Sequence, residues 1–151
     1  MSSSAEIPRG MDQLPLKVLI VEDNPERQKT LRALFREHAW VSVNTARRAV
    51  RLLEVFDFDM IALDYDLDGE ETGEKVAEFL AHSRNANAKV WVHSMNVQGV
   101  KQIQKYLPDS VAVPYSKIIR DNSTFKKLRA SINKGTDIDW AYVFRRKDST
   151  P

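Results

Sequence analysis

The segment Met60-Ile-Ala-Leu-Asp64 decides the fold, because four apolar residues lead directly into a carboxylate. Lys17-Val-Leu-Ile-Val21 is built in the same way and is followed by Glu22 and Asp23. A third run, Lys89-Val-Trp-Val-His-Ser94, ends on a hydroxyl. Parallel strands that are buried on both faces take the form of short apolar runs, and such sheets bind ligands where their strands end. The three runs therefore predict parallel strands with polar groups gathered at one sheet edge.

Helical patterns separate five predicted strands. The strands are expected at residues 17–21, 41–44, 60–64, 89–94 and 110–113. Apolar residues at helical spacing follow each strand, and Asn24, Thr45, Asn96 and Ser123 stand where helix-capping residues are preferred. Alternating strands and helices are typical of an α/β fold. The sequence thus predicts a doubly wound, five-stranded parallel sheet.

The chain divides into one domain and two flanking segments. Residues 1–15 are polar, contain prolines and a glycine, and are expected to form a flexible N-terminal lead. Residues 16–134 carry the strand and helix pattern, and residues 135–151 form a short C-terminal extension. The apolar segment Trp140–Phe144 within this extension is expected to pack on the domain as a strand or a turn, or to form a surface for a partner.

Composition excludes several classes of function. Lys and Arg number 23 against 21 Asp and Glu, so a net charge of +2 gives no electrostatic argument for binding nucleic acid. The chain has no cysteine, which excludes disulfides and thiolate chemistry and suits a reducing compartment. No apolar run approaches the ~20 residues of a membrane span, and the first residues do not resemble a signal peptide. We therefore expect a cytoplasmic protein without a membrane partner.

The polar residues at the strand ends suggest phosphoryl chemistry. Glu22 and Asp23 offer hard oxygen ligands, which suit Mg²⁺. Asp64 could share that ion and act as a nucleophile toward phosphorus, with the Ser94 hydroxyl holding another oxygen. His93 is either a structural histidine or a catalytic group. Strand alternation places neighbouring side chains on opposite faces, so His93 and Ser94 should diverge if the strand stays regular to its end.

These residues, in this order, resemble the CheY-like receiver domains of two-component response regulators. The resemblance covers residues 16–134 and implies a flavodoxin-like (βα)5 fold. It implies that Glu22 and Asp23 bind the metal ion together with Asp64, that Asp64 is the phosphoacceptor, and that Ser94 is the switch hydroxyl. The implied partners are a histidine kinase or a small phosphodonor, and a protein that receives the signal.

The fifth strand departs from the receiver pattern. Receivers usually end this strand with a lysine followed by proline, and the lysine contacts the phosphoryl group. The segment here is Val111-Ala-Val-Pro-Tyr-Ser-Lys117, in which Pro114 is expected at the usual place of the lysine. Lys117 would reach the site only if the loop folds back. Tyr115 matches the aromatic switch position poorly in register.

Two segments resemble a subtype, the cyclic-phosphate-processing receivers. They are Leu63-Asp-Tyr-Asp-Leu67, with Thr72-Gly73 after it, and His93-Ser-Met-Asn96, with Gly99 after it. The subtype usually has Leu-Asp-His-Asp-Leu and His-Ser-x-Asn, so Tyr65 replaces a histidine here. The resemblance implies a role in handling phosphate esters or cyclic phosphates.

Three functional hypotheses follow. The first is a single-domain receiver that accepts a phosphoryl group on Asp64 with Mg²⁺ and signals by protein contact, through the fourth helix, fifth strand and fifth helix. The second is a metal-dependent enzyme acting on cyclic phosphates or phosphate esters. Its candidate residues are Asp64, His93, Ser94 and Asn96. The third is a receiver-like adaptor that takes no phosphate, motivated by Pro114 and the position of Lys117.

Overall fold

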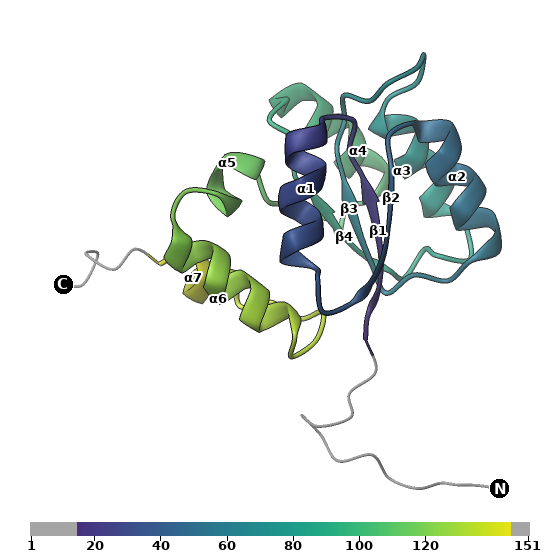
Figure 1. Ribbon diagram of the computed structural model, residues 1–151. Coiled ribbons are helices and arrows are strands. Elements are labelled where there is room, and N and C mark those ends of the chain that lie inside the picture. The colour runs from purple at the N-terminus through teal and green to yellow at the C-terminus, as the bar shows by residue number, and fades with distance from the viewer. Residues whose placement is uncertain (1–14, 146–151) are drawn as a thin grey trace, which may run out of the picture.

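Five parallel strands form one sheet in the order β2-β1-β3-β4-β5 (Figure 1). The strands are β1 (Lys17–Val21), β2 (Ala39–Val43), β3 (Met60–Leu63), β4 (Lys89–Val92) and β5 (Val111–Ala112). The computed structural model describes residues 15–145. The doubly wound parallel sheet predicted from the sequence is confirmed.

Seven helices connect or follow the strands within the described residues. They are α1 (Pro25–Leu34), α2 (Ala46–Val55), α3 (Gly73–Ala81), α4 (Val97–Tyr106), α5 (Tyr115–Ile118), α6 (Asn122–Ile132) and α7 (Trp140–Phe144). Asn24, Thr45 and Asn96 cap α1, α2 and α4 as predicted. The expected start of the last domain helix at Ser123 is wrong, because Asp121 caps α6 with an oxygen that accepts from the backbone N–H of Thr124 at 2.7 Å.

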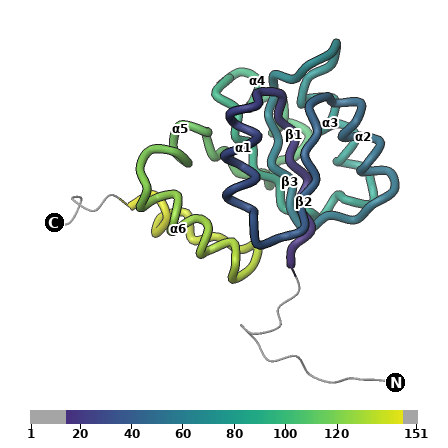
Figure 2. Tube along the Cα trace, viewed as in Figure 1, coloured from purple at the N-terminus to yellow at the C-terminus, as the bar shows by residue number. Residues whose placement is uncertain are grey.

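Helices cover both faces of the sheet, as the trace in Figure 2 shows. One core lies between the sheet and α2, α3 and α4, and includes Ile61 and Leu63 of β3. The other lies between the sheet and α1, α5, α6 and α7, and includes Met60 and Ala62 of the same strand. Alternate residues of one apolar strand thus enter two different cores, which is why the strand sequences are continuously apolar.

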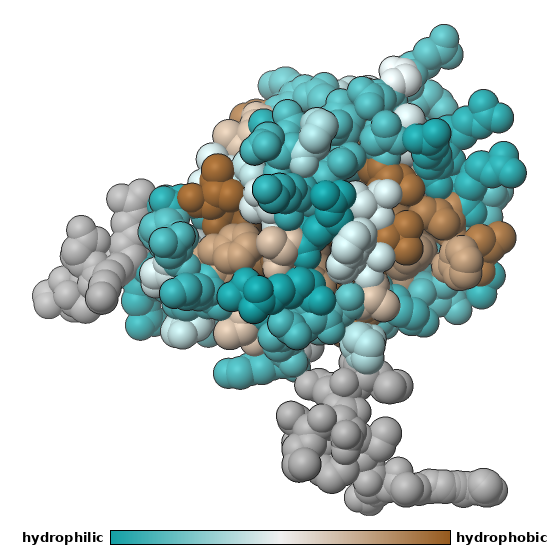
Figure 3. All heavy atoms as spheres, viewed as in Figure 1, coloured by the Kyte–Doolittle hydropathy of each residue, from teal (hydrophilic) through white to brown (hydrophobic). Residues whose placement is uncertain are grey.

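The two edge strands differ from their predicted bounds. β2 begins two residues earlier than expected, because its pairing with β1 starts where Ala39 lies beside Lys17. β5 has only two residues, because the chain leaves the strand at Pro114 and begins α5 there. The edge strand β2 leaves Trp40 and Val41 partly exposed, whereas hydrophilic side chains dominate the face seen in Figure 3.

The described part of the C-terminal extension forms a helix, so the expectation of a strand or a turn is wrong. Asp139 caps α7, and its side chain accepts from the backbone N–H of Tyr142 at 3.1 Å. The ring of Trp140 packs edge-on against Trp91 of β4, with 4.9 Å between the ring centroids, and Val143 is buried. The expectation that this segment packs on the domain is therefore confirmed.

Residues 1–14 and 146–151 lie outside the described residues, so the predicted flexible lead and the end of the extension stay predictions. Among the helices of residues 15–145, none combines the length and the hydrophobicity that crossing a bilayer requires.

Candidate functional site

A single row of four residues crosses the carboxyl edge of the sheet. The backbone ladder continues one residue past four of the strands, where N–H groups donate to carbonyls of neighbouring strands at 2.9–3.0 Å. These residues are Glu22, Asp64, His93 and Val113. Their side chains share one face because each stands in the same register after its strand. By alternation this is the face covered by α1 and α6, since Ile20 and Ala62, two residues earlier, belong to that core.

Three polar side chains of this row are buried together. The exposed fractions of Glu22, Asp64 and His93 are 0%, 3% and 1%. Each offers one potential metal-ligating atom, and these atoms all lie within 4.8 Å of one another. His93 Nε2 lies 2.7 Å from Glu22 Oε1, whereas His93 Nδ1 is buried and has no hydrogen-bond partner among the described residues. Carboxylates and imidazole at this spacing fit a divalent cation.

The pKa of the Asp64 carboxyl is raised toward neutral pH. Burial raises the pKa of the Asp64 carboxyl from 3.8 to about 6, and the negative charge of Glu22 adds to the rise. His93, the Ser94 hydroxyl and the backbone N–H of Tyr65 act in the opposite direction. The Tyr65 N–H donates to Asp64 Oδ1 at 2.8 Å. Asp64 is thus mostly ionised at neutral pH, as a nucleophilic carboxylate must be.

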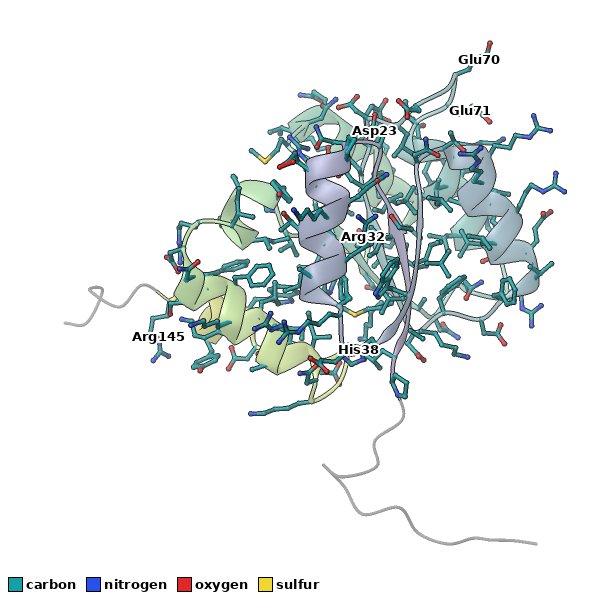
Figure 4. All side chains as sticks on the ribbon, in the orientation of Figure 1. Asp23, Arg32, His38, Glu70, Glu71 and Arg145 are labelled. Atoms are coloured by element: carbon teal, nitrogen blue, oxygen red, sulfur yellow. The ribbon has the colours of Figure 1, made fainter. Side chains whose placement is uncertain are left out.

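Glu22 and Asp23 have different environments although they are adjacent. Burial by itself would raise the pKa of Glu22, but the hydrogen bond and charge of His93 outweigh it and lower the pKa. The backbone N–H of Asn24, which donates to Glu22 Oε2 at 3.0 Å, and the charge of Arg27 act in the same direction. Burial raises the pKa of Asp23, and the neighbouring carboxylates of Glu22 and Asp68 raise it further. Asp23 lies at the edge of the site above α1 (Figure 4) and is not in the group of three ligand atoms that the described residues contain.

Ser94 and Asn96 are held by hydrogen bonds at the start of α4. The backbone N–H of Asn96 donates to Ser94 Oγ at 3.1 Å, and Asn96 Oδ1 accepts from the N–H of Gly99 at 2.9 Å. Both His93 and Ser94 lower the pKa of the Asp64 carboxyl. The divergence of these neighbours was expected only if the strand stayed regular to Ser94, and that condition is not met because β4 ends at Val92.

Two glycines allow the loop after β3 to pack against two helices. A Cβ atom on Gly73 would overlap the backbone carbonyl of Asp64, and one on Gly99 would overlap the ring of Tyr65. Gly73 N–H also donates to the carbonyl of Tyr65 at 2.7 Å. The Thr72-Gly73 and Gly99 elements of the sequence are therefore required for the backbone of α3 and the N-terminal turn of α4 to approach Asp64 and Tyr65.

The end of strand five brings no cation to the row. Val113 is the row residue there and is fully buried, whereas Pro114 stands one residue further along and begins α5. Val113, and not Pro114, is therefore the residue that continues the row after β5. Lys117 lies on α5 with its Nζ 5.4 Å from the centre of the Phe144 ring of α7. Tyr115 lies under the guanidinium of Arg27, 5.1 Å from the ring centre.

Comparisons with known proteins agree with this fold. The family described as the cyclic-phosphate processing receiver domain matches residues 15–109. No curated protein matches the sequence. Three solved structures are similar at the level of fold, and all come from signalling proteins.

The first is the receiver domain of the sensor histidine kinase PA1611 from Pseudomonas aeruginosa PAO1, with a magnesium ion coordinated in its active-site cleft. It is 24% identical with a TM-score of 0.54, over 64% of this chain and 80% of that chain. The phosphorylated cyanobacterial phytochrome response regulator RcpA is 19% identical with a TM-score of 0.59, over 80% and 89% of the two chains. The response regulator TrrA from Thermotoga maritima, in complex with Mg²⁺ and BeF, is 18% identical with a TM-score of 0.59, over 75% and 98%.

Proposed function

Since this chain belongs to the family of cyclic-phosphate processing receiver domains, we propose that it is a receiver that accepts a phosphoryl group on Asp64. The observation that carries the proposal is the buried row at the carboxyl edge of the sheet. Asp64 ends the strand between β1 and β4, so that it lies beside both Glu22 and His93. A carboxylate in this position is buried against another carboxylate, which is costly unless a cation or a proton compensates it.

The chemistry follows from the residues around Asp64. An oxygen of its carboxylate attacks the phosphorus of a phosphodonor, a P–O or P–N bond to the leaving group breaks, and an aspartyl phosphate results. A divalent cation such as Mg²⁺, held by Glu22, Asp23 and Asp64, would neutralise negative charge on the transferring group. The Ser94 hydroxyl, which lowers the pKa of the Asp64 carboxyl, would be available to an oxygen of the phosphoryl group.

The donor we propose is a histidine kinase or a small acyl phosphate, and the output is contact with another protein. Magnesium in the PA1611 receiver, and the phosphorylated state of RcpA, are the parallels that support this proposal. Met95 and Val97 at the start of α4, and Ile119 after α5, have exposed apolar side chains. Apolar side chains that are exposed near a switching site suit a protein contact.

The test is intact mass spectrometry after incubation with acetyl phosphate and MgCl₂. Wild-type protein is expected to gain one phosphoryl group, and Asp64→Asn to gain none. Asp57→Asn is the matched control, because Asp57 is an exposed carboxylate paired with Arg84 at 2.7 Å. Phosphoryl uptake by Asp64→Asn would contradict the proposal. A lack of uptake by the wild-type protein would contradict it as well.

A second candidate function is the opening of a cyclic phosphate ester, and the position of His93 favours it. The row contains an imidazole whose Nδ1 has no hydrogen-bond partner within residues 15–145, and its residue after strand five is the apolar Val113. In this reaction water attacks phosphorus, one ester P–O bond breaks, and the released alkoxide takes a proton. His93 is placed to transfer a proton, with Asp64, Ser94 and Asn96 around the reacting group.

Turnover of a panel of cyclic phosphates in the presence of a divalent cation tests this candidate. His93→Ala is expected to abolish turnover, and His82→Ala, which alters an exposed histidine, is expected to retain it. Turnover that His93→Ala leaves unchanged would eliminate the candidate. The same panel separates it from phosphoryl acceptance, because an acceptor adds mass to the protein whereas a hydrolase releases product.

A further inference from the structure

His93 is buried in the row of polar side chains at the carboxyl edge of the sheet. One of its ring nitrogens, Nε2, lies 2.7 Å from Glu22 Oε1. The other ring nitrogen, Nδ1, is also buried and has no hydrogen-bond partner among the described residues. Buried polar atoms are almost always satisfied, so a histidine with such an atom is a candidate for a binding role.

The ring is also held rigidly among potential ligands. Glu22, Asp64 and His93 come from three neighbouring strands, and their backbones are fixed by consecutive ladder hydrogen bonds of 3.0 Å. One potential ligand atom of each residue lies within 4.8 Å of those of the other two. Two carboxylates and an imidazole that are brought together in this way can share one divalent cation.

We propose that His93 is a ligand of the cation site and that the site therefore prefers a divalent transition-metal ion such as Zn²⁺ to Mg²⁺. Mg²⁺ favours oxygen ligands and retains its waters, whereas imidazole suits Zn²⁺ and its neighbours in the first transition row. The inference rests on the proposed cation site beside Asp64, but it concerns which ion binds and does not depend on phosphoryl transfer.

The first test measures binding of ZnCl₂ and MgCl₂ to the full chain by isothermal titration calorimetry. Wild-type protein is expected to bind Zn²⁺ more tightly than Mg²⁺ by at least about tenfold. His93→Gln keeps a hydrogen-bond donor for Glu22 but removes the imidazole, and it is expected to lose about 10- to 100-fold in Zn²⁺ affinity. His82→Gln is the matched control for adventitious binding to a surface histidine and should retain wild-type affinity.

The second test needs no variant. The chain has three histidines, so their ring nitrogens can be assigned by ¹⁵N NMR. Saturation with Zn²⁺ is expected to shift the ring-nitrogen resonances of His93 and to leave those of His38 and His82 in place. Equal affinities for the two ions, a Zn²⁺ affinity unchanged in His93→Gln, or an unshifted His93 resonance would each overturn the inference.

The outcome is separable from that of the proposed function. A Zn²⁺ site containing His93 in a protein that never takes up a phosphoryl group would support this inference and contradict phosphoryl acceptance. Phosphoryl uptake with Mg²⁺ by a protein whose His93 is indifferent to Zn²⁺ would do the reverse.

Discussion

Replacing Asp64 with Asn is expected to stabilise the protein at neutral pH in the absence of divalent cations. Burial raises the pKa of this carboxyl from 3.8 to about 6, so the native state binds its proton more tightly than the unfolded chain does. Above pH 6 the native state holds a buried charge that costs free energy. The difference between the two pKa values corresponds to about 3 kcal/mol at pH 7.5.

The unfolding free energy therefore depends on pH in the opposite sense to that of a protein whose carboxylate is paired with a cation. As the pH falls through 6, the native state takes up the proton first, and the penalty shrinks to about 1 kcal/mol at pH 4.5. Asn does not titrate, and its side-chain oxygen can still accept from the Tyr65 N–H, which is 2.8 Å from Asp64 Oδ1. The gain from Asp64→Asn should therefore be large at pH 7.5 and small at pH 4.5.

Urea unfolding followed by tryptophan fluorescence, in buffer containing EDTA, measures both values. Asp57→Asn is the control, because the hydrogen bond from Arg84 lowers the pKa of that exposed carboxyl and its removal should not stabilise the protein. Equal unfolding free energies of wild type and Asp64→Asn at pH 7.5, or a difference that does not change with pH, would refute the reasoning.

Three further predictions concern the cation and the packing around the site. A divalent cation at about 100 times its dissociation constant should raise the unfolding free energy of wild type by about 2.7 kcal/mol and that of Asp64→Asn by much less; equal increases in denaturant titrations would contradict this. Gly99→Ala should destabilise the protein by about 1–3 kcal/mol because its methyl group overlaps the Tyr65 ring, and by less in a Tyr65→Ala background, as a double-mutant cycle in urea would show. Trp140→Ala should cost about 2 kcal/mol because the ring packs against Trp91, and an unchanged melting temperature would indicate that α7 is not docked.

The sequence predicted the sheet because its strands are buried on both faces and separated by capped helices. It also identified Glu22 and Asp64 at the edge where parallel strands end. The sequence could not predict on which face of the sheet the His93 side chain lies. The residues before it, Val90–Val92, are all apolar and show no alternation of polar and apolar residues. The position of the His93 side chain follows only from the pairing of β3 with β4, in which Leu63 lies beside Val92 and Asp64 therefore lies beside His93.

Other differences also have local causes. The five residues of α7 are too few to show a helical period, so Trp140–Phe144 was not recognisable as a helix. Asp121 and Ser123 are both good capping residues, and only the observed hydrogen bond distinguishes them. The row position of Val113 depends on where β5 pairs with β4, which a short edge strand does not reveal in sequence.

The most direct test of phosphoryl acceptance locates the modified residue. Wild-type protein treated with acetyl phosphate and Mg²⁺ would be digested rapidly and its peptides analysed by mass spectrometry, with a hydroxylamine-treated half of the sample to cleave acyl phosphates. We predict one phosphoryl group on the peptide containing Asp64, lost on hydroxylamine treatment. An unmodified Asp64 peptide, or a hydroxylamine-resistant phosphoryl group elsewhere in the chain, would contradict the account.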